Sequence, residues 1–148
     1  MQNSDALALT AALLAAAGDL TRRIDEGVRA RGFSDVRPAH GFAFARLAPD
    51  GATVTELAVH LGVTKQAASQ LVDELVRKGY VERGPHPADA RARLVVLTEQ
   101  GWACTRVAEE VAVEAVRGWG DVLGEGEMSV LRDGLGRIAP YGPVRPAW

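Results

Sequence analysis

One regular apolar stripe marks the beginning of the chain. Its members follow one another at steps of three or four residues: Leu13, Ala17, Leu20, Ile24 and Val28. This spacing places them on one face of a helix, so we predict a single long helix over residues 5–31 that ends at Gly32. A shorter helix is expected over residues 39–47, before a turn at 49–51.

The next part of the chain predicts two helices joined by a tight turn. Thr53 followed by Glu56 is a capping box that starts the first helix. Gly62 suits the end of that helix, because glycine adopts a left-handed conformation at the least cost. Thr64 can cap the second helix, which Gly79 ends. The apolar face of the second helix repeats at helical spacing: Ala68, Leu71, Val72 and Leu75.

A two-stranded hairpin is predicted after these helices. Residues 80–81 and 94–97 favour strands, and the tip between them, 84–90, is rich in turn-forming residues. Such a ribbon is marginal by itself and must pack against the helices. The order helix, turn, helix, hairpin is that of a winged helix-turn-helix, which places one helix in the major groove of DNA and a loop beside it.

Two more helices and a tail are expected after the hairpin. Thr98 can cap a helix that runs to about Trp119. A last helix is expected over residues 125–138, with one apolar face: Met128, Leu131, Leu135 and Ile138. The tail, 140–148, has three prolines and is expected to be extended.

Composition fits a globular domain and excludes several other classes of protein. The 148 residues are 47% apolar and 24% charged, which is enough for one domain with a core. The most apolar stretch, 6–17, is too short to span a bilayer, is followed by Asp19, Arg22 and Arg23, and has no basic leader before it. The single cysteine, Cys104, excludes an intramolecular disulfide and fits a reducing compartment. We therefore expect a cytoplasmic protein with no membrane partner.

Charge is distributed unevenly along the chain. The net charge is −2 at pH 7, but residues 62–93 carry six cationic and four acidic side chains. The predicted helix-turn-helix is therefore mildly basic inside an acidic protein, which is the sign expected for contact with nucleic acid.

The outward positions of the second helix carry side chains that can contact DNA. They are Lys65, Gln66, Ser69 and Gln70, with Thr64 as the N-cap. Glutamine suits the edge of adenine, and lysine suits guanine or a phosphate. Any amphipathic helix has a polar outer face, so this face alone fits a solvated surface equally well. The preceding helix and the tight turn favour DNA binding.

The predicted tip of the wing carries Asp89 and Arg91, two residues apart. On a hairpin they lie on the same side, so we expect the carboxylate to orient the guanidinium. An arginine at a loop tip fits a narrow minor groove, where the potential is most negative. The alternative is a surface ion pair, which contributes about 0–1 kcal/mol. His86 in the same loop is expected to be exposed and within reach of a phosphate.

The segment resembles the MarR family of bacterial winged helix-turn-helix regulators. The residues that carry the resemblance are Glu56, Leu57, Ala58, Leu61, Gly62, Val63, Thr64, Ser69, Leu71, Val72, Asp73, Leu75, Gly79, Tyr80, Val81, Glu82, Arg83, Pro87, Asp89, Arg91, Leu97, Thr98 and Gly101. The wing of the family is roughly D-P-x-D-x-R, followed by a strand and L-T-x-x-G. His86 stands here where an acid is usual, which alters the charge of the wing and leaves Asp89 and Arg91 intact.

The resemblance, which covers about residues 38–140, implies a homodimer with interleaved terminal helices. The expected fold class is mainly α (α+β), a winged helix-turn-helix at 38–101 with dimerisation helices at 1–37 and 102–148, all in one compact domain. The N-terminal stripe and three residues of the last helix would form the interface: Leu131, Leu135 and Ile138. The paired recognition helices would enter successive major grooves of double-stranded DNA at a pseudo-palindrome. Many members release DNA when a small, often aromatic, effector binds between the dimer region and the DNA-binding lobe, and others respond to oxidation of a cysteine.

Other kinds of site find less support in the sequence. Cys104 is in register with apolar helix positions, which favours a buried, inert thiol over a redox sensor. The spacings of His40, His60 and His86 match no metal motif, so no metal or cofactor is expected. Four aromatic residues fit either the core or an effector pocket: Phe42, Phe44, Trp102 and Trp119.

The function expected from the sequence is that of a DNA-binding transcriptional regulator. No catalytic triad or phosphate-binding loop is visible, so an enzyme is not expected. The specific hypothesis is a ligand-responsive repressor that binds its operator as a dimer. The alternative is a winged-helix dimer used for protein contact without DNA readout, because a fold alone does not decide function.

Overall fold

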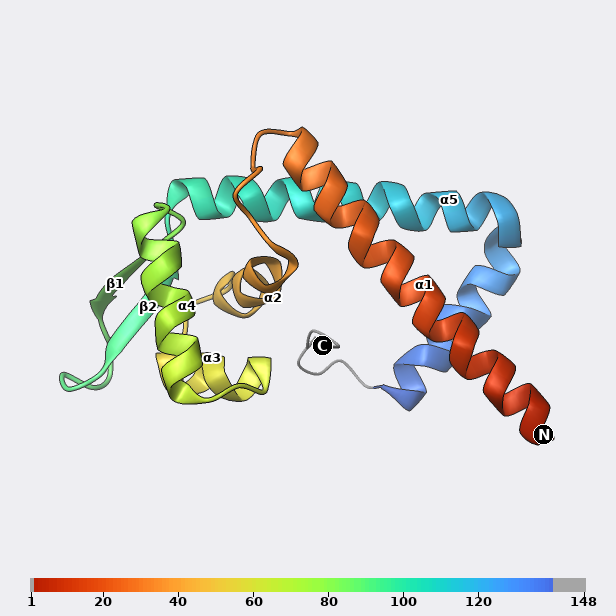
Figure 1. Ribbon diagram of the computed structural model, residues 1–148, viewed down its shortest axis with the longest axis horizontal. Helices are drawn as coiled ribbons and strands as arrows, with labels where there is room; N and C mark the ends of the chain where they lie inside the picture. Colours follow the sequence, from red (N-terminus) through yellow and green to blue (C-terminus); the bar gives the residue numbers. More distant parts are fainter. Residues whose placement is uncertain (1, 140–148) are drawn as a thin grey trace.

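Over residues 2–139, which the computed structural model describes, the chain folds into five helices and one two-stranded sheet (Figure 1). The elements are α1 (Asn3–Ala30), α2 (Pro38–Leu47), α3 (Val54–Leu61), α4 (Lys65–Arg77), β1 (Val81–Pro85), β2 (Arg93–Leu97) and α5 (Glu99–Ile138). The prediction of a mainly helical winged fold is confirmed. The expected extended tail, 140–148, lies outside the described residues.

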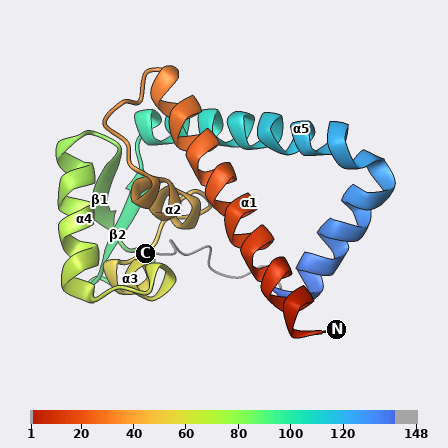
Figure 2. The ribbon, with the colours of Figure 1, turned by 45° about the vertical axis from the view of Figure 1, so that its right-hand side comes forward.

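The elements separate into a winged lobe and two arms. The winged lobe, residues 28–115, contains α2, α3, α4, the hairpin and the first part of α5. The arms, residues 3–27 and 116–138, are the remaining parts of α1 and α5. Helix α1 packs mainly against α5. In Figure 2, α1 and the two parts of α5 form three sides of a triangle beside the winged lobe.

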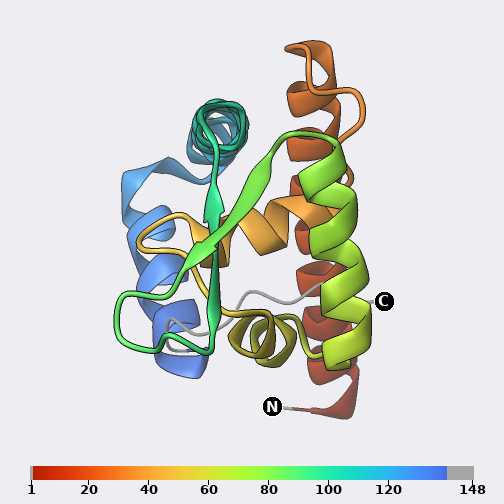
Figure 3. The same cartoon turned by 90° about the vertical axis from the view of Figure 1, so that its left-hand side faces the viewer.

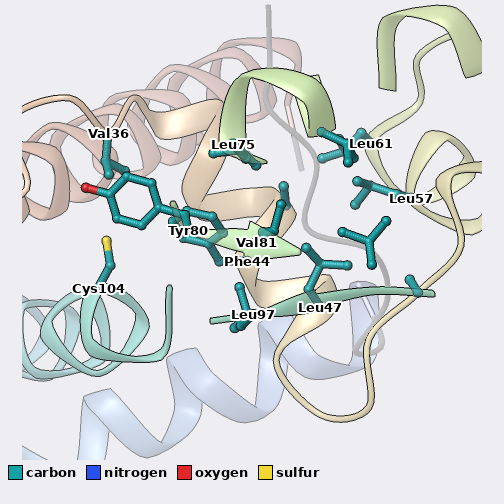
Figure 4. Packing of buried hydrophobic residues seen from close by; sticks show 14 of the residues in the cluster. Val36, Phe44, Leu47, Leu57, Leu61, Leu75, Tyr80, Val81, Leu97 and Cys104 are labelled. Carbon is teal, nitrogen blue, oxygen red and sulfur yellow. The ribbon is translucent and has the colours of Figure 1, made fainter. Parts of the chain in front are cut away.

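Phe44 of α2 and Tyr80, just before β1, lie at the centre of the core (Figure 4). Their ring centroids are 5.6 Å apart. Leu75 of α4, Leu97 of β2 and Cys104 of α5 pack around them, and all five residues are buried. One core therefore joins α4, the hairpin and the base of α5, so that the elements expected to contact DNA are held as a unit.

The predicted caps of the helix-turn-helix are present. Thr53 Oγ1 accepts the backbone N–H of Glu56 at 3.2 Å, and Glu56 Oε2 accepts that of Thr53 at 2.8 Å. Gly62 ends α3 in the left-handed conformation, at φ 68°. Thr64 Oγ1 accepts the backbone N–H of Ala67 at 3.0 Å and caps α4. The boundaries of α3 and α4 therefore follow from local chemistry that is readable in the sequence.

The wing hairpin is longer than the sequence predicted. β1 begins at Val81 rather than at Tyr80 and continues to Pro85, which pairs with Arg93 at the start of β2. The loop between the strands is therefore 86–92, as long as the expected tip at 84–90 and shifted by two residues. Strand pairing uses backbone groups, so the polar residues of β1 do not prevent it. Ala52, before α3, forms an isolated antiparallel bridge with β2 through two backbone hydrogen bonds with Val95, of 3.0 and 2.8 Å.

Helix α5 bends sharply at Gly124. The backbone there has φ 77° and ψ 166°, a conformation that only glycine adopts readily. The predicted break before residue 125 is confirmed, but the predicted end near Trp119 is wrong, because the helix runs on to the bend (Figure 1). Gly118 and Gly120 lower helix propensity without ending the helix.

Helix α1 is more apolar on its surface than the sequence analysis expected. An 18-residue window reaches a mean hydropathy of 1.2, so by length and composition alone the helix could cross a membrane. None of that window is buried in the protomer. The helix therefore presents an apolar surface that the other described residues do not cover.

Candidate nucleic-acid interface

The N-terminal end of α4 presents the polar face predicted to contact DNA. Lys65, Gln66 and Gln70 are exposed, and Ser69 is half-buried. The opposite face of the helix is fully buried: Ala68, Val72 and Leu75. Thr64 holds the start of the helix through its cap, so its side chain positions α4.

The wing and the start of α4 lie at the same end of the winged lobe. Figure 3 shows α3 between them, with the loop of the wing at the same level as the first turn of α4. The predicted residues of α4 and of the wing therefore share one end of the molecule, as two elements that contact the same duplex must.

Asp89 organises the tip of the wing in a different way from the prediction. Its Oδ1 accepts the backbone N–H of Arg91 at 2.9 Å. In the described part of the chain the guanidinium of Arg91 forms no hydrogen bond or ion pair, so the expected orientation of the guanidinium by the carboxylate is wrong. A carboxylate two residues before an N–H forms a local turn more readily than a long-range pair. Asp89 thus fixes the backbone and leaves the Arg91 side chain exposed.

A salt bridge between Arg83 of β1 and Asp73 of α4 ties the wing to the helix. The Arg83 Nη2 to Asp73 Oδ1 distance is 2.6 Å. Sequence reasoning did not find this pair, because nothing in the spacing marks two residues ten positions apart on two different elements. The bridge connects β1 to α4 and neutralises an acid beside the polar face of the helix.

Within residues 62–93 of the described chain, cations without an ion pair outnumber acids without one by four to two, the two acids being Glu82 and Asp89. Asp73 and Glu74 form ion pairs. Four cations of the same segment form none: Lys65, Arg77, Arg91 and Arg93. A cation without an acidic partner breaks no ion pair when it binds a phosphate and displaces a counterion.

A second group of polar residues, the polar joint, connects the loop after α1 with the end of α4. It consists of Asp35, Arg37, His40, Glu74, Lys78 and Tyr80. Glu74 is its hub, with Oε2 accepting from Arg37 Nη2 at 2.8 Å and Oε1 lying 3.0 Å from Lys78 Nζ. The Lys78 hydrogen bond holds the pKa of Glu74 down, to about 2, with smaller contributions from His40 and Arg37.

Two other members of the polar joint, Tyr80 and His40, are fully buried. The Tyr80 hydroxyl donates to Asp35 Oδ1 at 2.6 Å, and burial together with this hydrogen bond raises the pKa of Tyr80. His40 is fully buried, and its Nδ1 accepts the backbone N–H of Arg37 at 3.0 Å. Burial lowers the pKa of His40, and the charge of Arg37 lowers it further. The i,i+4 spacing of Glu74 and Lys78 was the only sequence signal for this group.

Two further expectations concern residues away from this interface. Cys104 is 1% exposed, and burial raises its pKa to about 11, which confirms the prediction of a buried thiol. Phe44 belongs to the core, whereas Trp102 is 38% exposed. None of the four aromatic residues lines the hollow on the inner side of the α5 bend, where Val113, Val116 and Met128 lie.

No cluster of three or more potential metal ligands occurs in residues 2–139. His40 is committed to the polar joint, with its Nε2 3.5 Å from Glu74 Oε2. His86 belongs to the loop of the wing, where its Nδ1 accepts backbone N–H groups.

Comparison with known proteins places this geometry in context. Residues 37–92 match the model of the MarR family. Wild-type MarR of E. coli in the apo form has 27% identity and a TM-score of 0.71, over 89% of this chain and 96% of that chain. A mutant MarR of E. coli complexed with operator DNA has 25% identity and a TM-score of 0.72, over 92% and 96%.

A third similar structure extends the match in fold. RV1404 from Mycobacterium tuberculosis has a TM-score of 0.77 over 100% of this chain and 99% of that chain, at 23% identity, which concerns the fold alone. No curated protein matches the sequence significantly.

Proposed function

Since the chain belongs to the MarR family of DNA-binding winged-helix transcription regulators, we propose that it is a repressor that binds a pseudo-palindromic operator as a homodimer and leaves it when a small aromatic molecule binds. The observation that carries the proposal is the shared end of the winged lobe, where the polar face of α4 and the unpaired Arg91 of the wing lie together.

Each element of the interface has its own task in this proposal. Gln66 and Gln70 contact base edges in the major groove, where glutamine can pair with adenine. Lys65 and Ser69 contact bases or phosphates at the first turns of α4. Arg91 enters the minor groove beside it, where the negative potential attracts an exposed guanidinium. Thr64 and Asp89 position these side chains through the backbone hydrogen bonds described above.

The arms support the proposal of a homodimer. Large apolar side chains are more than half exposed along both arms: Leu7, Leu9, Leu14, Val122, Val130 and Ile138. Monomeric proteins rarely leave apolar surface of this extent uncovered. A second copy of the chain, covering these arms with its own, would place two α4 helices on one side of a duplex, about one helical turn apart.

Selection of bound DNA from a random pool tests the proposal directly. A repressor of this kind enriches a pseudo-palindrome with half-sites about one helical turn apart. Repeating the selection with a panel of aromatic acids identifies an effector as the compound that abolishes enrichment. A winged helix used only for protein contact would enrich no sequence and would bind mixed-sequence duplex without the steep loss of affinity that added salt causes in DNA-binding proteins.

Substitutions then separate base contacts from phosphate contacts. Gln66→Ala or Gln70→Ala should relax preference at individual base pairs, at a cost of about 1–3 kcal/mol each. Arg91→Ala should weaken binding without unfolding the protein. Arg106→Ala, which removes an exposed cation of α5 that forms no ion pair in the described chain, is the matched control and should leave affinity unchanged.

A further inference from the structure

The tip of the wing folds as two linked turns, each held by a side chain. In the first turn, His86 Nδ1 accepts the backbone N–H groups of Ala88 at 3.1 Å and Asp89 at 3.2 Å. In the second turn, Asp89 Oδ1 accepts the N–H of Arg91 at 2.9 Å, and the Asp89 carbonyl accepts that of Ala92 at 3.2 Å. Asp89 belongs to both turns. A loss of the His86 hydrogen bonds would therefore alter the backbone at Asp89, which holds the backbone at Arg91.

The hydrogen bonds of His86 define the state of its ring. A ring nitrogen that accepts two N–H groups must carry a lone pair, so the proton of the neutral imidazole is on Nε2. Protonation would place an N–H on Nδ1, facing two backbone donors, and both hydrogen bonds would be lost. A carboxylate or an amide oxygen in the same place would accept both N–H groups over the whole neutral range. The imidazole does so only while it is neutral.

We propose that neutral His86 is a positioning residue of the wing, whose Nδ1 holds the first turn and thereby the backbone at Arg91, and that protonation of the ring releases the tip and weakens binding of DNA. The statement about DNA rests on the proposed function, whereas the statement about the turn does not. Among residues 2–139 the His86 Nε2 has no hydrogen-bond acceptor, so that N–H is available to a phosphate oxygen.

The charged groups around His86 do not replace its hydrogen bonds. From α3, Glu56 lies near enough for the charge of His86 to contribute to its lowered pKa, after the larger effect of the hydrogen bond from the Thr53 N–H. That carboxylate accepts from Thr53 and lies 3.8 Å from Arg46 Nη2. Within the loop, the Asp89 carboxylate accepts the Arg91 N–H. Neither acid forms a hydrogen bond with the imidazole in the described chain, so the ring is held by the backbone alone.

Nuclear magnetic resonance on the full, DNA-free chain tests the turn independently of DNA. At neutral pH we expect the 15N shift of His86 Nδ1 to be that of an unprotonated acceptor and the shift of Nε2 to be that of a protonated nitrogen. The amide shifts of Ala88, Asp89 and Arg91 should change together with the ring signals of His86 as the pH is lowered from about 8 to 5. A proton on Nδ1 at neutral pH, or amides that do not follow the ring, would overturn the proposal.

Two variants provide the matched comparison. In His86→Asn, the Oδ1 of asparagine can accept the same N–H groups and does not titrate, so the amide shifts should keep their native values at every pH. In His86→Ala the turn has no acceptor, and the amides should have the shifts of the acidic wild type already at neutral pH. Native shifts in His86→Ala would contradict the assigned role.

Binding of a mixed-sequence duplex as a function of pH tests the consequence for DNA. From pH 8 to 5, the wild type should lose about fivefold more affinity than His86→Asn, and His86→Ala should be about fivefold weaker at pH 8, the factor that loss of a capping side chain typically gives. His40 and His60 are present in all three proteins, so only the difference between them reports on His86. Equal pH profiles, or tighter binding by the wild type in acid, would overturn the positioning role. Absence of binding by every protein, with the amide shifts as expected, would reject the proposed DNA binding and not the turn.

Discussion

The winged lobe and the arms differ in how completely each buries its own apolar residues. In the described chain, every buried side chain lies between Val28 and Ala115, and residues 2–27 and 116–139 contain none. The arms are nevertheless rich in large apolar side chains, with Leu14 66% and Val122 83% exposed. The difference teaches that the winged lobe is stabilised by contacts within one chain, whereas the described residues leave much of the apolar surface of the arms uncovered.

The largest expected effect comes from opening the core of the winged lobe. Leu75 of α4 is fully buried, and Leu75→Ala should lower the free energy of unfolding by about 2–5 kcal/mol, since it leaves a cavity. Urea unfolding measures the loss. Val76→Ala, at the next and 38% exposed position, is the control and should change stability by about 0.5 kcal/mol or less. Equal effects of the two substitutions would mean that the core does not stabilise the lobe.

A charge in the arms should break the dimer and spare the lobe. With Leu14 covered by a second chain, Leu14→Asp should weaken dimerisation by about 3 kcal/mol, or roughly a hundredfold in dissociation constant. Sedimentation equilibrium measures the change. Val59→Asp, at a position of the lobe with nearly the same exposure, 67% against 66%, should leave the oligomeric state unaltered. A Leu14→Asp protein that dimerises like the wild type would show that this part of α1 is not covered by a second copy.

The bend at Gly124 should matter for the arms alone. The backbone conformation at Gly124 costs residues other than glycine about 1–3 kcal/mol, so Gly124→Ala introduces strain at the bend. We expect weaker dimerisation and unchanged urea unfolding of the winged lobe. Gly126→Ala, two residues away in the helix and in open space, is the matched control and should not weaken the dimer. If both variants behaved like the wild type, the bend would not shape the interface.

The smallest expected effect is a dependence of stability on pH at the polar joint. Because the pKa of His40 is lowered in the folded protein, the unfolded chain takes up the proton first, and stability should fall as the pH drops below about 6.5. A second loss should follow as the pH falls from about 4.5 toward 2, because the pKa of Glu74 is lowered as well.

Urea unfolding at a series of pH values measures both losses. In His40→Gln the side chain can still accept the N–H of Arg37 without titrating. The first loss should therefore become smaller in this variant, and the second should persist. An unchanged first loss would assign it to another group.

Local chemistry made much of the fold predictable from the sequence. The caps at Thr53 and Thr64 and the left-handed Gly62 depend on residues within four positions, so α3 and α4 could be placed before any coordinates. The outward face of α4 followed from helical periodicity. The length of β1 did not, because backbone pairing with β2 overrides the polar character of its residues.

Contacts between distant residues escaped prediction. The pair of Arg83 and Asp73 and the pair of Arg37 and Glu74 depend on how elements pack, and spacing along one element carries no trace of them. The predicted role of Asp89 was wrong in its detail for the opposite reason. Its carboxylate accepts the nearby backbone N–H of Arg91 instead of the Arg91 guanidinium. The residues expected to contact DNA are exposed where the prediction placed them, and their contacts stay a prediction.

The length of the straight part of α5 also determines how far the wing moves when the angle at the Gly124 bend changes. From Glu99 to Leu123 the helix is unbroken, which makes a rod about 37 Å long at 1.5 Å per residue. One end follows β2 directly, with Thr98 between them, and the other end is the bend. A rotation of about 10° at the bend displaces the base of the wing by about 6 Å, which exceeds the 3.4 Å rise of one base pair. In the proposed complex with DNA, the angle at the bend would therefore limit how precisely the wing keeps its position along the duplex.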